Sequence, residues 1–182
     1  MQRLAATWPA LDAVWVMGTS AGGAGATLHY SAIRQALGAQ AHLITDSAPG
    51  FTEPEDAAKW AFWGLQPPCP TCTNIGDIRA YNRALDAQAR QAFLSFRFDA
   101  TTANGRSAAA FDAELQALMA ELRSHPQTHT LLIDNSATGF GPPVAHVVTT
   151  KNTPAWLAAS HSSFLQAMVT GTGWQSTVVL PP

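Results

Sequence analysis

Charged side chains are scarce in this chain, and the few that are present nearly balance. Aspartate, glutamate, lysine and arginine make up 12% of the 182 residues, and the formal net charge is −2. This balance provides no basic surface of the kind that binds nucleic acid or an anionic membrane. No stretch approaches the roughly 20 apolar residues of a membrane span. We therefore expect neither nucleic acid nor a membrane as a partner.

The N-terminal residues lack the apolar core of a secretory signal peptide. Residues 1–9 contain one arginine and no long apolar run. The lack of such a signal fits a cytoplasmic protein, and it fits equally a chain whose true start lies upstream.

Cysteine is nearly absent, since the chain has only Cys69 and Cys72, in one C-x-x-C flanked by prolines. A structural zinc site usually needs four ligands, and there is no second C-x-x-C and no paired histidine motif. A thioredoxin-like motif would lie between a strand and a helix rather than in a proline-rich loop. We expect a local disulfide formed in an oxidising compartment, with two free thiols as the alternative.

The segment Gly18–Gly23 is the most informative part of the chain. It follows the apolar run Ala13–Met17, which predicts a short buried strand, and it leads into Ala24–Leu37, which predicts a helix. A serine on such a turn, with glycines two positions before and after it, is typical of a nucleophile elbow. Small neighbours let the backbone pass close beneath the serine, so that its hydroxyl stands clear. We therefore expect Ser20 to be a nucleophile.

The start of the following helix supplies the second part of this prediction. Backbone N–H groups at a helix N-terminus stabilise negative charge, so Ala21 and Gly22 are the expected oxyanion-binding residues. Phosphate binding is the competing interpretation of a glycine-rich turn. The glycines do not have the G-x-G-x-x-G spacing, and no Lys-Ser/Thr pair ends a P-loop.

The rest of the chain alternates expected strands and helices, which predicts an α/β fold: a mainly parallel sheet with covering helices. The expected later strands and helices are His42–Thr45, Phe93–Phe98, 107–123, Thr128–Ile133 and 154–169. Residues 50–90 are less regular and predict a lid-like excursion that contains a polar helix near Ile78–Arg90. Residues 1–182 show no repeat and no linker, so we expect one domain.

A nucleophilic serine needs a general base, and the base needs an acid that orients it. In doubly wound hydrolases these residues follow in the order Ser, Asp or Glu, His, on loops after later strands. Asp99 ends the third expected strand and His146 follows the fourth. We assign Ser20 as nucleophile, His146 as base and then acid, and Asp99 as the residue that orients the imidazole.

Other residues compete for the roles of acid and base. Asp134 and Asp46 also follow strands, although the first favours a turn and the second a loop-shaping role. His161 lies within the last expected helix and His29 on the elbow helix, where packing or structural roles are more common. The remaining histidines flank strands without a partner signal: His42, His125 and His129.

Four ordered motifs resemble the pectin acetylesterase family, which includes the Notum-type carboxylesterases and many bacterial members. They are Gly18–Gly25, Thr45–Phe51, the strand-terminal Phe98-Asp99 and Ala145–Thr149. The resemblance runs from about Val14 to Trp174. Other hydrolases share the elbow, so the specificity of the resemblance rests on the ordered set.

The resemblance implies an α/β-hydrolase-like fold and hydrolysis of carboxylic esters, commonly acetyl groups on a polysaccharide. The family's triad carries over to Ser20, Asp99 and His146, with no metal or organic cofactor. Family members are mostly secreted or periplasmic, which would suit a Cys69–Cys72 bridge.

Two departures from the family pattern bear on the site. Ala48 stands where a glycine is usual, and no glycine precedes Gly18, whereas the family has an earlier glycine-rich segment that helps to form the oxyanion hole. Several strands also precede the elbow strand in doubly wound hydrolases. We therefore expect this chain to be the C-terminal portion of a longer domain that lacks its N-terminal strands, and to be slow on its own.

The leading hypothesis is a serine carboxylesterase that acts on a small-molecule or polysaccharide ester through an acyl-enzyme. The alternative is a non-catalytic or truncated remnant of the same fold that binds carbohydrate on Trp60, Phe62 and Trp63. A lipase or peptidase is a third reading, because these enzymes share acyl-transfer groups.

Overall fold

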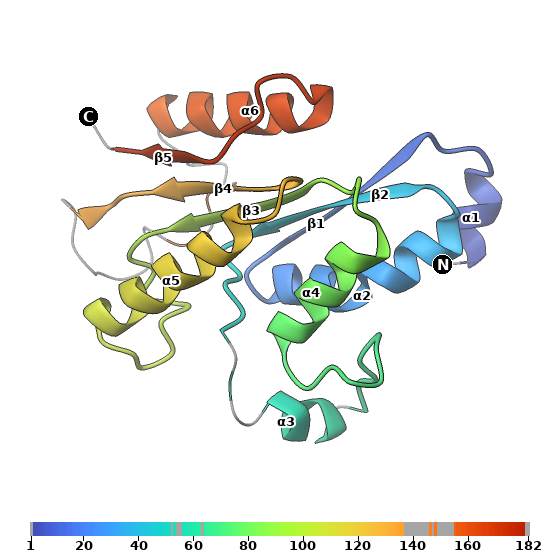
Figure 1. Ribbon diagram of the computed structural model, residues 1–182, viewed down its shortest axis with the longest axis horizontal. Helices are drawn as coiled ribbons and strands as arrows, with labels where there is room; N and C mark the ends of the chain where they lie inside the picture. Colours follow the sequence, from blue (N-terminus) through green and yellow to red (C-terminus); the bar gives the residue numbers. More distant parts are fainter. Residues whose placement is uncertain are drawn as a thin grey trace.

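The computed structural model describes residues 2–51, 53, 56–62, 64–136, 146, 148 and 155–180. In it the chain forms a five-stranded sheet, ordered β1-β2-β3-β4-β5, in which every neighbouring pair is parallel (Figure 1). The strands are β1 (Ala13–Thr19), β2 (Gln40–Asp46), β3 (Gln91–Phe96), β4 (Thr128–Ile133) and β5 (Thr177–Val179). The helices are α1 (Gln2–Thr7), α2 (Ala21–Leu37), α3 (Asp56–Phe62), α4 (Ile75–Leu85), α5 (Ala108–Arg123) and α6 (Ala155–Thr170). The expected α/β class with a parallel sheet is confirmed.

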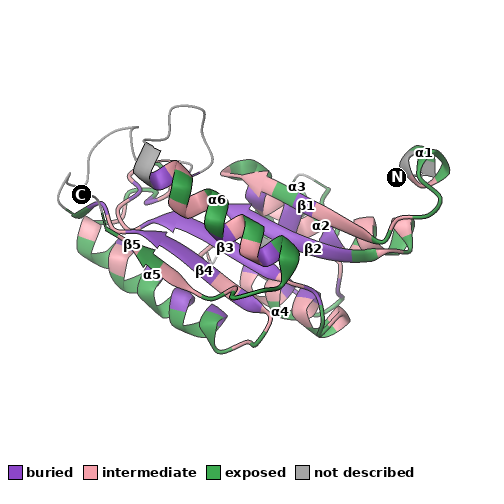
Figure 2. Cartoon of the chain, turned by 90° about the horizontal axis from the view of Figure 1, so that it is seen from above, coloured by how far each residue is buried: buried purple, intermediate pink, exposed green. Residues whose placement is uncertain are grey.

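The central strands are buried on both faces. All six residues of β3 are buried, and alternate residues enter different clusters. Phe93 packs with the α5 side chains, whereas Leu94 and Phe96 pack with the α6 side chains. The helices α5 and α6 therefore cover opposite faces of the sheet, and Figure 2 shows the buried strands between them. Burial on both faces is why β3 is apolar throughout rather than alternating.

Several strands and helices begin or end a few residues away from the expected positions. The third strand ends at Phe96, so Asp99 lies three residues beyond it. The polar helix of the excursion is α4, which begins earlier than expected because the Asn74 side chain caps it by accepting the Asp77 N–H. The short elements α1, α3 and β5 were not expected, since periodicity gives little signal over three to seven residues.

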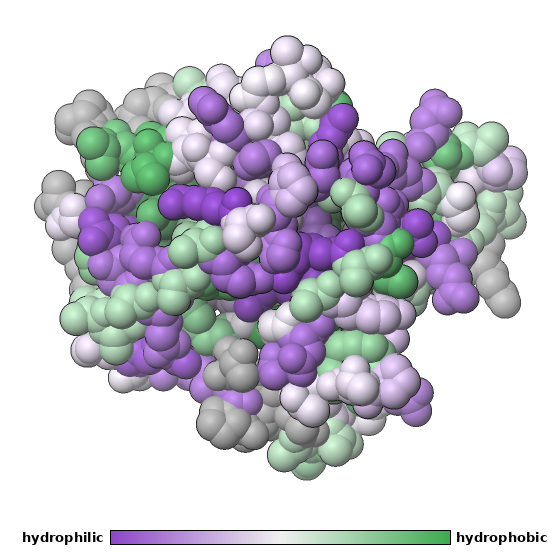
Figure 3. Space-filling view, viewed as in Figure 1, coloured by the Kyte–Doolittle hydropathy of each residue, from purple (hydrophilic) through white to green (hydrophobic). Residues whose placement is uncertain are grey.

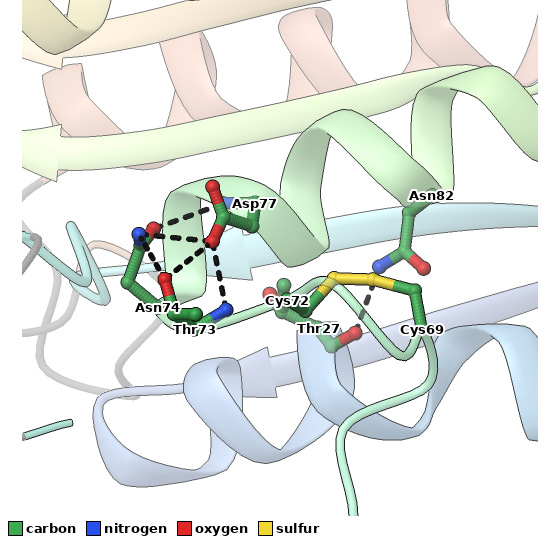
Figure 4. The surroundings of a disulfide bond; sticks show 7 residues. All are labelled: Thr27, Cys69, Cys72, Thr73, Asn74, Asp77 and Asn82. Carbon is green, nitrogen blue, oxygen red and sulfur yellow. Dashed lines mark hydrogen bonds between the residues drawn. A yellow bond between two sulfur atoms is a disulfide. The ribbon is translucent and has the colours of Figure 1, made fainter. Parts of the chain in front are cut away.

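The excursion between β2 and β3 contains the expected disulfide. Cys69 and Cys72 are bonded, with Cα atoms 5.4 Å apart, and both are buried with Ile75 and Ile78. Figure 4 shows the bridge beside the start of α4 and above α2. In the same view the Asn82 amide donates a hydrogen bond of 2.8 Å to the Thr27 carbonyl, which fastens α4 to α2.

The two edge strands expose apolar side chains. Met17 on β1 is 46% exposed, and Val178 and Leu180 at the β5 edge are 50% and 68% exposed. The hydrophobic patch over the end of β5 stands out in Figure 3 against a largely polar face. Within the described residues, no helix has both the length and the apolar character needed to cross a membrane.

Candidate active site

Ser20 occupies the sharp turn between β1 and α2. Its backbone has φ 52° and ψ −126°, a conformation that residues other than glycine rarely adopt. The Ser20 N–H donates to the Asp46 carbonyl at 2.8 Å, and the Ser20 carbonyl accepts the N–H groups of Gly23 and Ala24. These bonds hold the strained residue from both sides. Strain of this kind, maintained by its surroundings, is typical of functional sites.

Two glycines make this turn possible for steric reasons. A Cβ atom at Gly18 would lie 2.0 Å from the Gly22 carbonyl oxygen, so β1 could not pass beneath α2 with any larger residue. A Cβ atom at Gly23 would lie 2.5 Å from the Ala48 methyl group. A Cβ atom at Gly22 would meet open space. The essential pair is therefore Gly18 and Gly23, rather than the Gly18 and Gly22 of the sequence pattern.

The expected oxyanion residues begin α2. The first N–H groups of a helix have no partner within the helix. The N–H groups of Gly23 and Ala24 donate to the Ser20 carbonyl oxygen. The N–H groups of Ala21 and Gly22 lie before these two in the first turn of the helix. Ala21 lines the hollow beside Ser20, and Gly22 is not among the described residues that line it. The Ala21 amide is thus the better placed of the two.

Asp99 and His146 are in contact, as expected. Oδ2 of Asp99 lies 2.7 Å from Nδ1 of His146, and the Asp99 side chain is fully buried while that of His146 is 16% exposed. The other oxygen, Oδ1, accepts the N–H groups of Thr101 and Thr102 at 3.0 and 3.1 Å. The carboxylate is therefore fixed by its own loop and presents one oxygen to the imidazole.

The competing carboxylates have other partners. Asp134 forms an ion pair of 2.8 Å with Arg97. Asp46 is fully buried, and its Oδ1 accepts the Val148 N–H and the Ser47 hydroxyl, both at 2.9 Å. Among the described contacts, Asp99 is the one carboxylate hydrogen-bonded to His146.

The other histidines have structural surroundings. Nδ1 of His42 accepts the Arg90 N–H at 3.0 Å, and burial together with the Arg90 charge lowers the pKa of His42. His129 packs edge-on against Trp174, and burial lowers its pKa. Burial also lowers the pKa of His161, against an opposing effect of the Asp46 charge. The remaining two lie at partly or fully exposed positions, His125 and His29.

A hollow of about 350 Å³ opens beside Ser20. One wall is apolar and comes from α2, the β2 loop, α3 and α4: Ala24, Leu28, Ala48, Pro49, Gly50, Phe51, Trp60 and Ile75. The other residues that line it are Ser20, Ala21, Ser47, Glu53, Thr101, Thr102, Asn104 and Arg106. The Arg106 guanidinium lies 4.9 Å from the Phe51 ring centre and is paired with Glu53 and Glu114, so its charge is already neutralised. The hollow is therefore amphipathic and holds no unpaired cation among its described residues.

Asn135 is a site residue that the sequence reasoning missed. Its Oδ1 accepts the Phe98 N–H and its Nδ2 donates to the Phe98 carbonyl, both at 2.8 Å. Phe98 directly precedes Asp99, so this buried amide holds the main chain beside the Asp99 carboxylate. The sequence pattern at Asp134 favours only a turn, and an Asn135 side chain that reaches another loop has no sequence signature.

Several expected features lie outside the described residues. Trp63 of the aromatic cluster is one, and Pro154 at the start of the last helix is another. In the motif Ala145–Thr149, only His146 and Val148 are described. The described residues contain no group of three or more histidine, cysteine or acidic side chains placed to hold a metal ion.

Comparison of the chain with protein-family models, curated proteins and solved structures found no match. The resemblance to the pectin acetylesterase family therefore rests on the motifs, and the function has to be argued from the site.

Proposed function

We propose that this chain is a serine carboxylesterase with an α/β-hydrolase-like arrangement of its sheet and its catalytic groups. The observation that carries the proposal is the buried Asp99 carboxylate, 2.7 Å from His146, in a chain whose Ser20 lies on a strained strand-to-helix turn. Ester, thioester and peptide hydrolysis share this machinery. The motif resemblance favours carboxylic esters, with acetyl esters on a polysaccharide as the substrate class.

The proposed proton path follows from the contact with Asp99. An ionised Asp99 accepts the Nδ1–H of His146, which leaves the lone pair of the neutral imidazole on Nε2. Nε2 takes the Ser20 proton as the hydroxyl oxygen attacks the ester carbonyl carbon. Asp99 remains ionised and stabilises the imidazolium that forms.

The remaining steps use the start of α2. The carbonyl oxygen becomes an oxyanion beside the Ala21 N–H, which donates a hydrogen bond to it. The intermediate collapses, the alcohol oxygen takes the proton from His146, and the acyl group stays on Ser20. Water then attacks the acyl-enzyme, with His146 acting again as base, and releases the carboxylic acid. The hollow beside Ser20 has room for the alcohol part of an ester as well as for an acetyl group.

The disulfide supports a secreted or periplasmic location for this enzyme. Disulfides persist in oxidising compartments and are rare in a reducing cytosol. Cys69 and Cys72 are bonded and buried, which fits such a compartment.

Ser20→Ala tests the proposal. The variant should lose on the order of 10⁴-fold or more of p-nitrophenyl acetate hydrolysis, because the nucleophile is gone, while its far-ultraviolet circular dichroism stays unchanged. A fluorophosphonate should label the wild-type chain at Ser20, as read by peptide mass, and Ser31→Ala on the same helix should be labelled like wild type. A folded Ser20→Ala variant with wild-type activity would contradict Ser20 as the nucleophile. A wild-type chain that stays unlabelled would contradict the hydrolase proposal and favour a carbohydrate-binding remnant.

A further inference from the structure

Asp46, the last residue of β2, contacts both halves of the candidate site. Its backbone carbonyl accepts the Ser20 N–H at 2.8 Å. Its side-chain Oδ1 accepts the Val148 N–H at 2.9 Å, and Val148 lies two residues after His146. One residue is therefore bonded to the nucleophile turn through its main chain and to the base loop through its side chain.

The surroundings of Asp46 make it a firm anchor. It pairs with Thr19 of β1 on one side and with Leu94 of β3 on the other, so it belongs to the central part of the sheet. The next residue, Ser47, turns away with φ 52°, while its N–H donates to the Leu94 carbonyl at 2.8 Å. The Ser47 hydroxyl donates to Oδ1 of Asp46 at 2.9 Å, which helps to fix the direction of the carboxylate.

A buried carboxylate keeps its charge only when hydrogen-bond donors replace water. The side chain of Asp46 is fully buried, and its donors include the Val148 amide, which comes from a segment about 100 residues away in sequence. Charge-assisted bonds of this kind are roughly twice as strong as neutral ones. Losing this acceptor would remove the hydrogen bond that ties Val148, and with it the segment that carries His146, to the end of β2.

We propose that Asp46 is a positioning residue that ties the His146 loop to the Ser20 turn, so that nucleophile and base stay aligned. This inference rests on the proposed serine hydrolase function. Asp46 does not contact the imidazole as Asp99 does, and it is not among the described residues that line the hollow beside Ser20. Asp46 would instead fix the distance between the Ser20 hydroxyl and the His146 imidazole, which lie on different loops. A misplacement of about 1 Å in such a pair lowers the rate roughly 10²-fold.

Three variants of the whole chain test this role. Asp46→Ala removes the acceptor, Asp46→Asn keeps an oxygen that can accept the Val148 N–H, and Asp77→Ala is the matched control. Asp77 accepts hydrogen bonds from Thr73 and Asn74 at the start of α4, where it belongs to the disulfide region rather than to the site. We expect fluorophosphonate labelling of Ser20 to slow by roughly 10²-fold in Asp46→Ala. Asp46→Asn should recover much of this loss, and Asp77→Ala should label at the wild-type rate.

Amide hydrogen exchange at Val148 gives a second readout that does not depend on turnover. The Val148 amide should exchange faster in Asp46→Ala than in the wild type and remain protected in Asp77→Ala. Slow labelling with an unchanged Val148 amide would show that Asp46 does not act through this loop. Wild-type labelling in Asp46→Ala would also overturn the inference.

The two proposals fail in distinguishable ways. If the wild-type chain is not labelled at all, the hydrolase proposal fails, and Val148 exchange alone decides whether Asp46 ties the two loops together. If Asp46→Ala does not fold, the conservative Asp46→Asn variant carries both measurements. In that case, unchanged labelling together with faster Val148 exchange would overturn the inference, because the loop would have moved without consequence.

Discussion

Two groups of carboxylates lie near the carboxyl end of the sheet, and they use their oxygens differently. Asp46 and Asp99 are fully buried, and among their described contacts the carboxylates accept hydrogen bonds chiefly from backbone N–H groups and, for Asp99, from His146. Asp112 and Asp134 keep 20% and 14% of their side chains exposed, and both pair with Arg97. The buried carboxylates connect loops to one another, whereas the partly exposed ones connect a helix and a strand end through a guanidinium.

This difference explains why proximity to a strand end is a poor guide to catalytic function. Arg97 neutralises Asp134, and the hydrogen bonds that Arg97 donates to Asp112 and Asp134 raise the pKa of Arg97. The hydrogen bond that Arg97 donates to Asp112 lowers the pKa of Asp112. A carboxylate whose negative charge is already neutralised by an arginine stabilises an imidazolium only weakly. Asp99 has only amide donors besides His146 among its described contacts, so its charge is directed at the imidazole.

The sharpest way to break this comparison is to neutralise one carboxylate from each group. Asp99→Asn should lower kcat for p-nitrophenyl acetate by roughly 10⁴-fold, because an amide neither fixes the imidazole tautomer nor stabilises the imidazolium. Asp134→Asn removes the charge of a carboxylate that faces Arg97 instead of His146, and it should retain activity within a few-fold. Steady-state kinetics with thermal melts for both variants decide the matter. Comparable losses of kcat in the two variants would refute the assignment.

A second test concerns the main chain beside the buried acid. Asn135→Ala removes both hydrogen bonds to Phe98 and should lower the free energy of unfolding by about 2–3 kcal/mol, since each polar group left unsatisfied costs about 1–3 kcal/mol. Urea denaturation measures the change. Ser136→Ala is the neighbouring control at an exposed position, and it should differ little from wild type. Equal stability of these two variants would show that the amide clamp is unimportant.

The disulfide region provides a test away from both groups of carboxylates. The double variant Cys69→Ser, Cys72→Ser should lose at most about 2 kcal/mol, because the closed loop is short and removes little chain entropy from the unfolded state. Thermal melts with and without a reducing agent measure this effect in the wild type, and intact mass before and after reduction establishes the bond. Free thiols in protein prepared in an oxidising compartment would contradict the structure at this point.

The smallest effect is expected among the partly exposed carboxylates and their partner Arg97. Arg97→Ala should change stability by no more than about 1 kcal/mol, since partly exposed ion pairs contribute about 0–1 kcal/mol and salt screens them. The difference from wild type should shrink further in 1 M sodium chloride. A large loss of stability in Arg97→Ala that persists in high salt would mean that these ion pairs contribute as much as the contacts of the buried carboxylates.

Some of this protein could be derived from the order of its residues. The strand over Thr128–Ile133 has the predicted bounds, because its β-branched and apolar residues end at the polar residues that begin with Asp134. The turn at Ser20 could be predicted because few residue types fit a strand-to-helix reversal of this kind. At position 18 only glycine leaves room for the Gly22 carbonyl. The disulfide was also foreseeable, since the two cysteines of the chain lie three residues apart in one proline-rich loop and have no other cysteine to pair with.

The tertiary structure decided what local patterns could not separate. Asp46, Asp99 and Asp134 all follow strands and look alike in sequence, yet only their surroundings determine whether a cation, a backbone amide or an imidazole faces each one. The roles of Asp46 and Asn135 depend on contacts between segments 102 and 37 residues apart. Sequence determines which side chains can accept a hydrogen bond, because that is a property of each residue. The packing of separate loops at one sheet edge determines which donor arrives, because that depends on the whole fold.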